Sequence, residues 1–324
     1  MRDAPSSGWQ DARLHVVTGK GGTGKTTVAA AMALTLASGG RRTLLIEVEG
    51  RQGIAQLFDV PPLPYQERKI AVPPDGGEVR ALAVDAEEAL LEYLEMFYRL
   101  GGAGRMLKRL GAIDFATTIA PGLRDVLLTG KVKEAVTRTD KSHRVYDAVV
   151  LDAPPTGRIG RFLNVTAEVA GLAKVGPIKS QSEGVAALLR SPMTAVHVVT
   201  VLEDMPVQET IDAIGELEEL DLPVGTVIVN MTRPPLLAGA KLTQAGLSRG
   251  LAAAGLPHDR ATVTGLLSEA RDQQSRLAQE GRLREELDEV GRPILELPFL
   301  ADGVGLSGLF TLADALADQG VHGH

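Results

Sequence analysis

Apolar runs recur along the chain and alternate with segments of helical pattern. Several runs are continuous stretches of Val, Ile and Leu, which is typical of strands covered on both faces in a parallel sheet. The strands predicted in this way span residues 14–18, 43–48, 79–84, 148–151, 196–201, 226–229 and 294–297. The alternation predicts an α/β fold with a doubly wound, mostly parallel sheet of about seven to eight strands.

Two stretches interrupt the alternation. Residues 86–138 and 162–192 are mostly helical in pattern, and both leave the predicted sheet beside the expected ligand site. They form either a helical subdomain inserted there or ordinary crossover helices packed on the sheet. We otherwise expect a single domain over residues 13–320, preceded by a flexible polar tail over residues 1–12 that lacks the pattern of a signal peptide.

The composition limits the cellular compartment and the classes of partner that the sequence favours. The chain of 324 residues has a net charge of −7 and no cysteine, which excludes disulfides and thiolate ligation of zinc, iron–sulfur clusters or soft metalloids. The acidic balance and the lack of a basic run argue against a direct nucleic-acid partner. No apolar run approaches the ~20 residues that span a bilayer, so a membrane link would come through a partner. These features favour a cytoplasmic protein.

The segment from Gly19 to Thr27 carries the most specific chemistry. It reads Gly-Lys-Gly-Gly-Thr-Gly-Lys-Thr-Thr and matches G-x-x-x-x-G-K-S/T, the loop whose backbone amides wrap the phosphates of a nucleoside triphosphate. A predicted strand precedes it, and a predicted helix follows it, as the motif requires. This helix starts near Lys25 and has its apolar stretch over residues 28–37. We expect Lys25 to lie along the β- and γ-phosphates, Thr26 to ligate Mg²⁺ and Thr27 to reach the α-phosphate. The rest of the phosphate cradle consists of Gly21, Gly22, Thr23 and Gly24.

Lys20 is a second lysine in this loop, one position after the first glycine, and the basic motif does not require it. Its side chain begins on the outer side of the phosphate cradle, where it cannot easily reach the γ-phosphate of its own chain. It could reach a γ-phosphate held by a facing subunit and stabilise the charge of the transition state, as an arginine finger does. The alternative is a solvated lysine on a loop.

Carboxylates follow two of the predicted strands at the edge where α/β sheets bind ligands. Glu49 comes directly after the strand over residues 43–48, and we expect it to orient the attacking water. Glu47 lies two residues earlier on the same face and is a candidate for the vicinity of Mg²⁺. Asp152 ends the strand over residues 148–151 and is predicted to hold Mg²⁺ through water, as a Walker B aspartate does. The alternative for both glutamates is a polar strand end without a ligand.

Two further positions add to the expected site. Residues 153–157 read Ala-Pro-Pro-Thr-Gly and join a stiff proline pair to a glycine pivot, so loss of the γ-phosphate would swing this segment. Asn230 follows the strand over residues 226–229, and its amide both donates and accepts. It can therefore pair with the N6 and N7 edge of adenine, unless it is only a turn residue.

With these residues in place, the chain resembles the arsenical pump-driving and tail-anchored-protein targeting ATPases over nearly its whole length. Residues 20–27 fit the deviant Walker A loop of that family with its intermonomer signature lysine. Residues 152–163, DAPPTGRIGRFL, closely follow the family switch II, DTAPTGHTLRFL. The resemblance implies a dimer that depends on ATP and Mg²⁺. The residues that it places on the nucleotide are Glu203, Asn230, Pro298 and Phe299.

The sequence differs from that family in the switch I segment and in its lack of cysteine. Relatives carry D-P-A-H-S/N-L-S-D where residues 49–56 read EGRQGIAQ, so Glu49 replaces the water-orienting aspartate on a stem about 1.5 Å longer. Because a small misplacement of a catalytic group is costly, we expect slow hydrolysis. The missing cysteines remove the metalloid site and the zinc clamp of those relatives, which argues against arsenite pumping.

The sequence thus predicts an Mg²⁺-dependent ATPase that works as a dimer and couples its nucleotide state to a conformational cycle on a protein or membrane-associated partner. A homodimer and a heterodimer with a paralogous ATPase both stay open. One alternative is a nucleotide-binding subunit that hardly hydrolyses ATP and pairs with an active paralogue. Others are a partitioning or division-site ATPase, which the acidic balance disfavours, and a phosphotransferase, for which no second-substrate site is evident.

Overall fold

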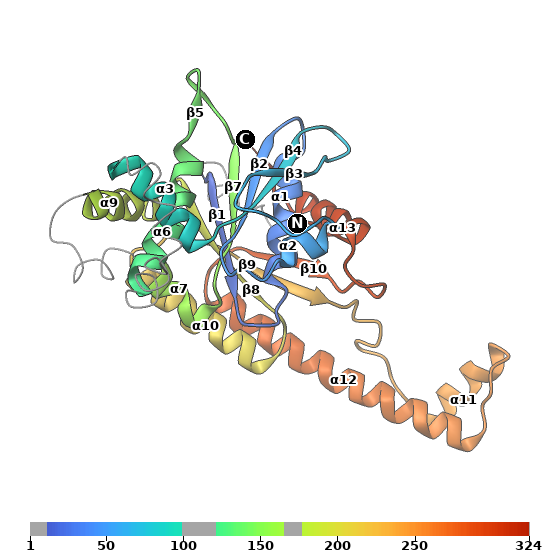
Figure 1. Ribbon diagram of the computed structural model, residues 1–324. Coiled ribbons are helices and arrows are strands. Elements are labelled where there is room, and N and C mark those ends of the chain that lie inside the picture. Colours follow the sequence, from blue (N-terminus) through green and yellow to red (C-terminus); the bar gives the residue numbers. More distant parts are fainter. Residues whose placement is uncertain (1–11, 99–120, 165–176, 324) are drawn as a thin grey trace.

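A mixed sheet of eight strands forms the centre of the molecule. The computed structural model describes residues 12–98, 121–164 and 177–323, so nearly all of the expected tail lies outside the described residues. The strand order is β10-β9-β8-β1-β7-β2-β4-β3, and every neighbouring pair is parallel except β3 and β4. Helices lie on both sides of the sheet (Figure 1). The predicted doubly wound, mostly parallel sheet is therefore confirmed.

The strands form where the sequence is apolar and β-branched. They are β1 (Leu14–Gly19), β2 (Arg42–Glu47), β3 (Arg68–Ala71), β4 (Glu78–Ala83), β7 (Ala148–Asp152), β8 (Thr194–Thr200), β9 (Val224–Thr232) and β10 (Ile294–Pro298), with a short hairpin of β5 (Thr139–Asp140) and β6 (His143–Arg144). All residues of β1, β7 and β8 are buried, because helices cover both faces there. The sequence did not predict β3, an antiparallel edge strand whose residues are all at least partly exposed.

Successive residues of each central strand enter different cores. The helices beside the sheet are α1 (Lys25–Ala37), α2 (Gly53–Leu57), α3 (Ala86–Tyr98), α6 (Pro121–Thr137), α7 (Thr156–Leu163), α9 (Pro177–Leu189), α10 (Asp204–Glu219), α12 (Arg260–Glu289) and α13 (Leu306–Asp318). Val16 and Leu44 face a core that is shared with α3, α6, α7, α9, α10 and the end of α12. Val17 and Leu45 face a second core that is shared with α1, α2 and α13. The sheet is therefore packed between two hydrophobic cores.

The described parts of the two predicted helical stretches are mostly helical. The first contains α3 and α6, with residues 99–120 outside the described part, and the second contains the end of α7 and all of α9, with residues 165–176 outside it. α6 contacts α3, α9 and β7, and its Val126 and Leu128 belong to the same core as the sheet. Whether these helices act as a separate subdomain stays a prediction.

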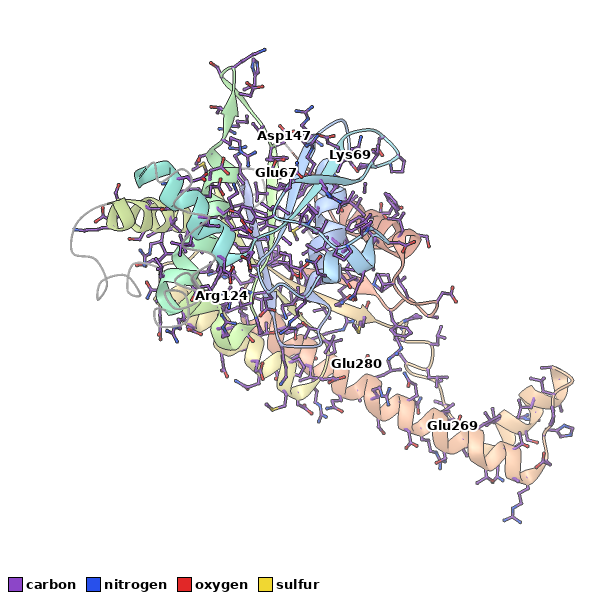
Figure 2. The ribbon with its side chains drawn as sticks, in the orientation of Figure 1. Glu67, Lys69, Arg124, Asp147, Glu269 and Glu280 are labelled. Atoms are coloured by element: carbon purple, nitrogen blue, oxygen red, sulfur yellow. The ribbon has the colours of Figure 1, made fainter. Side chains whose placement is uncertain are left out.

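An arm of two helices extends away from the body of the molecule (Figure 1). It consists of α11 (Gln244–Ala253), in which no residue is buried, and the first half of α12. Figure 2 shows Glu280 of α12 next to the body and Glu269 out on the arm. Leu283 and Leu287 at the other end of α12 are buried in the core. Within the described residues, no helix combines the length and apolar character needed to cross a bilayer.

Candidate functional site

The carboxyl ends of the parallel strands bring the predicted site residues to one edge of the sheet. β1 ends at Gly19 and continues into the phosphate loop, and β2 and β7 end at Glu47 and Asp152, which are opposite each other in the sheet register. Glu203 follows β8, and Asn230 lies near the end of β9. In a parallel sheet this edge is the usual ligand-binding side, so the topology supports the predicted location of the site.

Glycine is required in the phosphate loop by backbone conformation and by crowding. Gly24 has a φ of 87°, and a Cβ there would lie 2.4 Å from Asn230 Nδ2. A Cβ on Gly19 would lie 2.1 Å from the carbonyl oxygen of Val199. The loop leads into α1, whose amino-terminal end favours anions. Thr27 is half-buried in the first turn of that helix.

Thr26 and Asp152 form the predicted metal pair. Thr26 Oγ1 donates a hydrogen bond of 2.7 Å to Asp152 Oδ2, and Asp152 is 8% exposed. Its Oδ1 is buried without a hydrogen-bond partner among the described residues. Burial raises the pKa of Asp152 to about 6, although the Thr26 hydroxyl and the charge of Lys25 oppose this. An orphaned carboxylate oxygen beside a hydroxyl fits Mg²⁺, which takes oxygen ligands.

Lys25 is a buried cation at the first position of α1, directly after the phosphate loop. Its side chain is 9% exposed, and burial lowers the pKa of the ammonium while the charges of Asp152 and Glu49 raise it. A buried cation beside a phosphate-binding loop is suited to triphosphate oxygens, which would supply the negative charge that burial makes costly to leave unpaired.

Glu47 connects β2 to the following segment instead of pointing freely into the site. It is 2% exposed, and its two oxygens accept backbone hydrogen bonds of 3.4 Å from Gly53 and Ile54 at the start of α2. A Cβ on Gly53 would lie 3.2 Å from Thr26 Cγ2, so α2 begins directly against the metal pair. The expected position of Glu47 near the metal is compatible with this arrangement, because its charge also raises the pKa of Asp152.

Glu49 lies between two guanidinium groups. Its Oε2 is 3.6 Å from Arg51 Nη2, and its Oε1 is 3.9 Å from Arg158 Nη1 in the first turn of α7. The predicted water-orienting carboxylate is therefore paired with cations in its own chain. Sequence reasoning assigned no role to Arg158, although the switch II comparison contained a signal, since arginine stands there where the family pattern has histidine.

Lys20 contacts a carboxylate of its own chain. Its Nζ lies 2.7 Å from Glu209 Oε1 on α10, and the side chains of Lys20 and Glu209 are 29% and 37% exposed. The second oxygen of Glu209 lies 3.4 Å from Thr156 Oγ1, at the start of α7. No sequence pattern indicates this pairing, because the two residues are far apart along the chain.

A cleft of about 870 Å³ continues from the phosphate loop. Residues predicted to contact the nucleotide that line it are Gly21, Gly22, Thr23, Glu203, Asn230 and Phe299. Asn230 Nδ2 donates a hydrogen bond of 2.9 Å to the carbonyl oxygen of Thr23. The ring of Phe299 is stacked under the guanidinium of Arg233, 4.1 Å from the ring centroid, and neighbouring Pro298 is exposed at the end of β10. α12 adds Arg276, Gln279 and Glu280, which sequence reasoning missed.

Residues 12–193 match the sequence model of the anion-transporting ATPases. The chain belongs to the anion-transporting ATPase family. The ATPase BagA of Mycobacterium tuberculosis (strain H37Rv) is 57% identical over 329 residues, which cover 98% of this chain and 97% of the relative. The protein named ATPase GET3B of Arabidopsis thaliana is 23% identical over 280 residues, covering 71% of this chain and 66% of the relative. The predicted resemblance to this ATPase family is thereby confirmed.

Proposed function

We propose that this anion-transporting ATPase family member is an Mg²⁺-dependent ATP hydrolase that acts as a dimer and changes conformation with its nucleotide state. The observation that carries the proposal is the bond between Thr26 and Asp152, with the orphaned Oδ1 of Asp152, directly beneath a glycine loop. A buried carboxylate with a raised pKa and a free oxygen is costly unless a cation completes it.

The residues predicted to hold the phosphates, the metal and the attacking water then have separate roles. Lys25 and the loop amides hold the β- and γ-phosphates, and Thr26 with Asp152 holds the metal. Mg²⁺ supplies charge neutralisation on the phosphates and the leaving group. Glu49 orients the attacking water, and Lys20 of a facing copy stabilises the charge that develops in the transition state.

The base end of the site lies in the cleft beside the loop. Asn230 pairs with the adenine edge once its amide leaves the Thr23 carbonyl, and Phe299 provides an exposed aromatic face, 43% accessible, against which the base stacks. Glu203 lines the same cleft, at the N-cap position of α10.

The first test is phosphate release by the full chain with ATP and Mg²⁺. Wild type should release phosphate, whereas Glu49→Gln should abolish release and retain ATP binding, measured by calorimetry. Glu269→Gln makes the same chemical change out on the arm (Figure 2) and should behave as wild type. Equal rates in wild type and Glu49→Gln would remove Glu49 from the mechanism.

The second test is the mass in solution with and without ATP and Mg²⁺. The trans role of Lys20 needs two phosphate loops facing each other, so we expect a dimer that forms or tightens with nucleotide. A monomer under all conditions would exclude that role. Co-purification with a paralogous ATPase would favour a heterodimer over a homodimer, and co-purification with another protein would identify a client.

A second candidate is a nucleotide-binding subunit that closes on ATP and hardly hydrolyses it. The observation that favours it is the pairing of Glu49 with Arg51 and Arg158, because a carboxylate held by two guanidinium groups is less available to orient water. In this case wild type binds ATP tightly, releases almost no phosphate alone, and gains activity only when mixed with its active partner.

A further inference from the structure

The ion pair between Lys20 and Glu209 lies within one chain, although Lys20 is the residue that we expect to act across a dimer. Lys20 Nζ and Glu209 Oε1 are 2.7 Å apart. The backbone carbonyl of Lys20 accepts a hydrogen bond of 2.9 Å from Thr23 Oγ1, which fixes the main chain at this position. A lysine on a fixed backbone can exchange one anionic partner for another by rotating its four-carbon stem alone.

The other oxygen of Glu209 contacts the segment that follows Asp152. Thr156 Oγ1 lies 3.4 Å from Glu209 Oε2, and Thr156 is 4% exposed at the first position of α7. The same segment is held on β1, because Thr18 Oγ1 donates a hydrogen bond of 2.7 Å to the carbonyl oxygen of Pro154. One carboxylate therefore contacts both the signature lysine and the start of the helix that follows the metal aspartate.

We propose that Glu209 is a positioning residue that holds the Lys20 amine in its own chain while the site is empty, and releases it when nucleotide binding moves α7. The inference rests on the proposed function, because it assumes that Lys20 acts in trans. On release, the amine leaves one carboxylate and meets the phosphate of a facing copy, so one anionic partner replaces another. Glu209 thereby limits pairing of the chains in the absence of ATP.

Partial exposure of the pair makes this exchange feasible. Both side chains are about one-third accessible to solvent, so water can solvate each group as the contact opens. A fully buried ion pair would be much harder to break, because each separated charge would remain desolvated. The contact is therefore suited to a reversible switch more than to structural support.

Zero-length cross-linking tests the contact in the full wild-type chain. A carbodiimide activates the Glu209 carboxylate, which then forms an amide with an adjacent amine as the urea leaves. We expect a peptide linking Lys20 to Glu209 without nucleotide, and its loss with Mg²⁺ and a non-hydrolysable ATP analogue. Absence of that peptide in the empty protein overturns the inference.

Analogue binding, measured by calorimetry in the same samples, separates the two proposals. A chain that does not bind the analogue overturns the proposed function and this inference together. Equal cross-linking yields with the analogue bound overturn only the release of Lys20, and the proposed ATPase stands.

The concentration dependence of phosphate release tests the consequence. Glu209→Gln should reach half of its maximal rate per chain at about two- to fivefold lower protein concentration than wild type, as expected for loss of one partly exposed ion pair. Glu209→Asp keeps the charge and should lie between the two. Glu218→Gln is the matched control, because it removes an ion pair with Arg292 from the same helix and should behave as wild type.

A different outcome would give Glu209 a role in the nucleotide-bound dimer instead of the nucleotide-free chain. If Glu209→Gln lowers the maximal rate per chain and leaves the concentration dependence unchanged, then Glu209 orients Lys20 during the reaction. That result overturns its role as a partner in the empty state.

Discussion

Asp152→Asn should make the nucleotide-free protein more stable and, on the proposed function, weaken binding of ATP with Mg²⁺. The carboxylate is almost fully buried, and its only hydrogen bond from a described residue is that from Thr26. Burial raises its pKa from 3.8 to about 6. This difference corresponds to a cost of about 3 kcal/mol at pH values above 6, because each pKa unit is worth about 1.36 kcal/mol.

The sign of the pH dependence follows from the raised pKa. Since the folded protein binds this proton more tightly than the unfolded chain, the Asp152 side chain favours folding most below pH 3.8, and this contribution is lost as the pH rises through 6. An asparagine carries no such charge. We therefore expect Asp152→Asn to raise the free energy of unfolding by about 1–3 kcal/mol at pH 7.5, and the gain to vanish near pH 4.

Urea unfolding at a series of pH values, without nucleotide or Mg²⁺, measures this difference. Asp302→Asn, in an exposed loop, is the matched control and should change stability by less than about 0.5 kcal/mol. Calorimetry with ATP and Mg²⁺ should show at least about a tenfold loss of affinity in Asp152→Asn. An Asn variant that is less stable than wild type at pH 7.5, or a gain that does not change with pH, would refute the reasoning.

Three further changes test other parts of the site and the sheet. Gly24→Ala should lower ATP affinity at least about tenfold in calorimetry, because a Cβ would force Asn230 away and strain a backbone with a φ of 87°. Phe299→Ala should weaken ATP binding by about three- to tenfold and leave tripolyphosphate binding unchanged, since only the base would stack on that ring. His197 is fully buried in β8, and burial and the charge of His15 hold its pKa well below 6.5. Its neutral form therefore stabilises the fold above pH 6.5, and His197→Gln should show less loss of stability than wild type as the pH falls below this value.

The sequence predicted the sheet well because buried parallel strands are continuous apolar runs. The predicted strand over residues 148–151 differs from β7 only by Asp152, and the strand over residues 226–229 is the buried centre of a longer β9. β3 could not be found in this way, because an exposed edge strand beginning with Arg68 and Lys69 lacks that signal. The helix after the phosphate loop begins at Lys25, where the sequence predicted its start, and its apolar stretch over residues 28–37 is buried against the sheet.

The phosphate loop and the strand-end carboxylates were predictable because each is a local pattern. The bond between Thr26 and Asp152 follows from the position of each at its strand or helix end. The pairing of Lys20 with Glu209 was not predictable, since it depends on the rotation of α10 and on its packing beside the loop. A sequence pattern fixes which face of a helix is buried, but it does not identify the partner of a polar residue on the remaining face.

The carboxylates at the edge of the sheet explain why a nucleotide should bind with a metal. Glu47, Glu49, Asp152 and Glu209 all lie beside the phosphate loop. Glu49 and Glu209 are already paired with cations of this site. A triphosphate entering alone would bring several negative charges toward this group, and each phosphate oxygen would compete with a carboxylate for the same cation. A divalent ion that occupies the free oxygen of Asp152 offsets the repulsion where it is strongest. On the proposed function, these buried carboxylates would therefore make nucleotide binding depend on Mg²⁺.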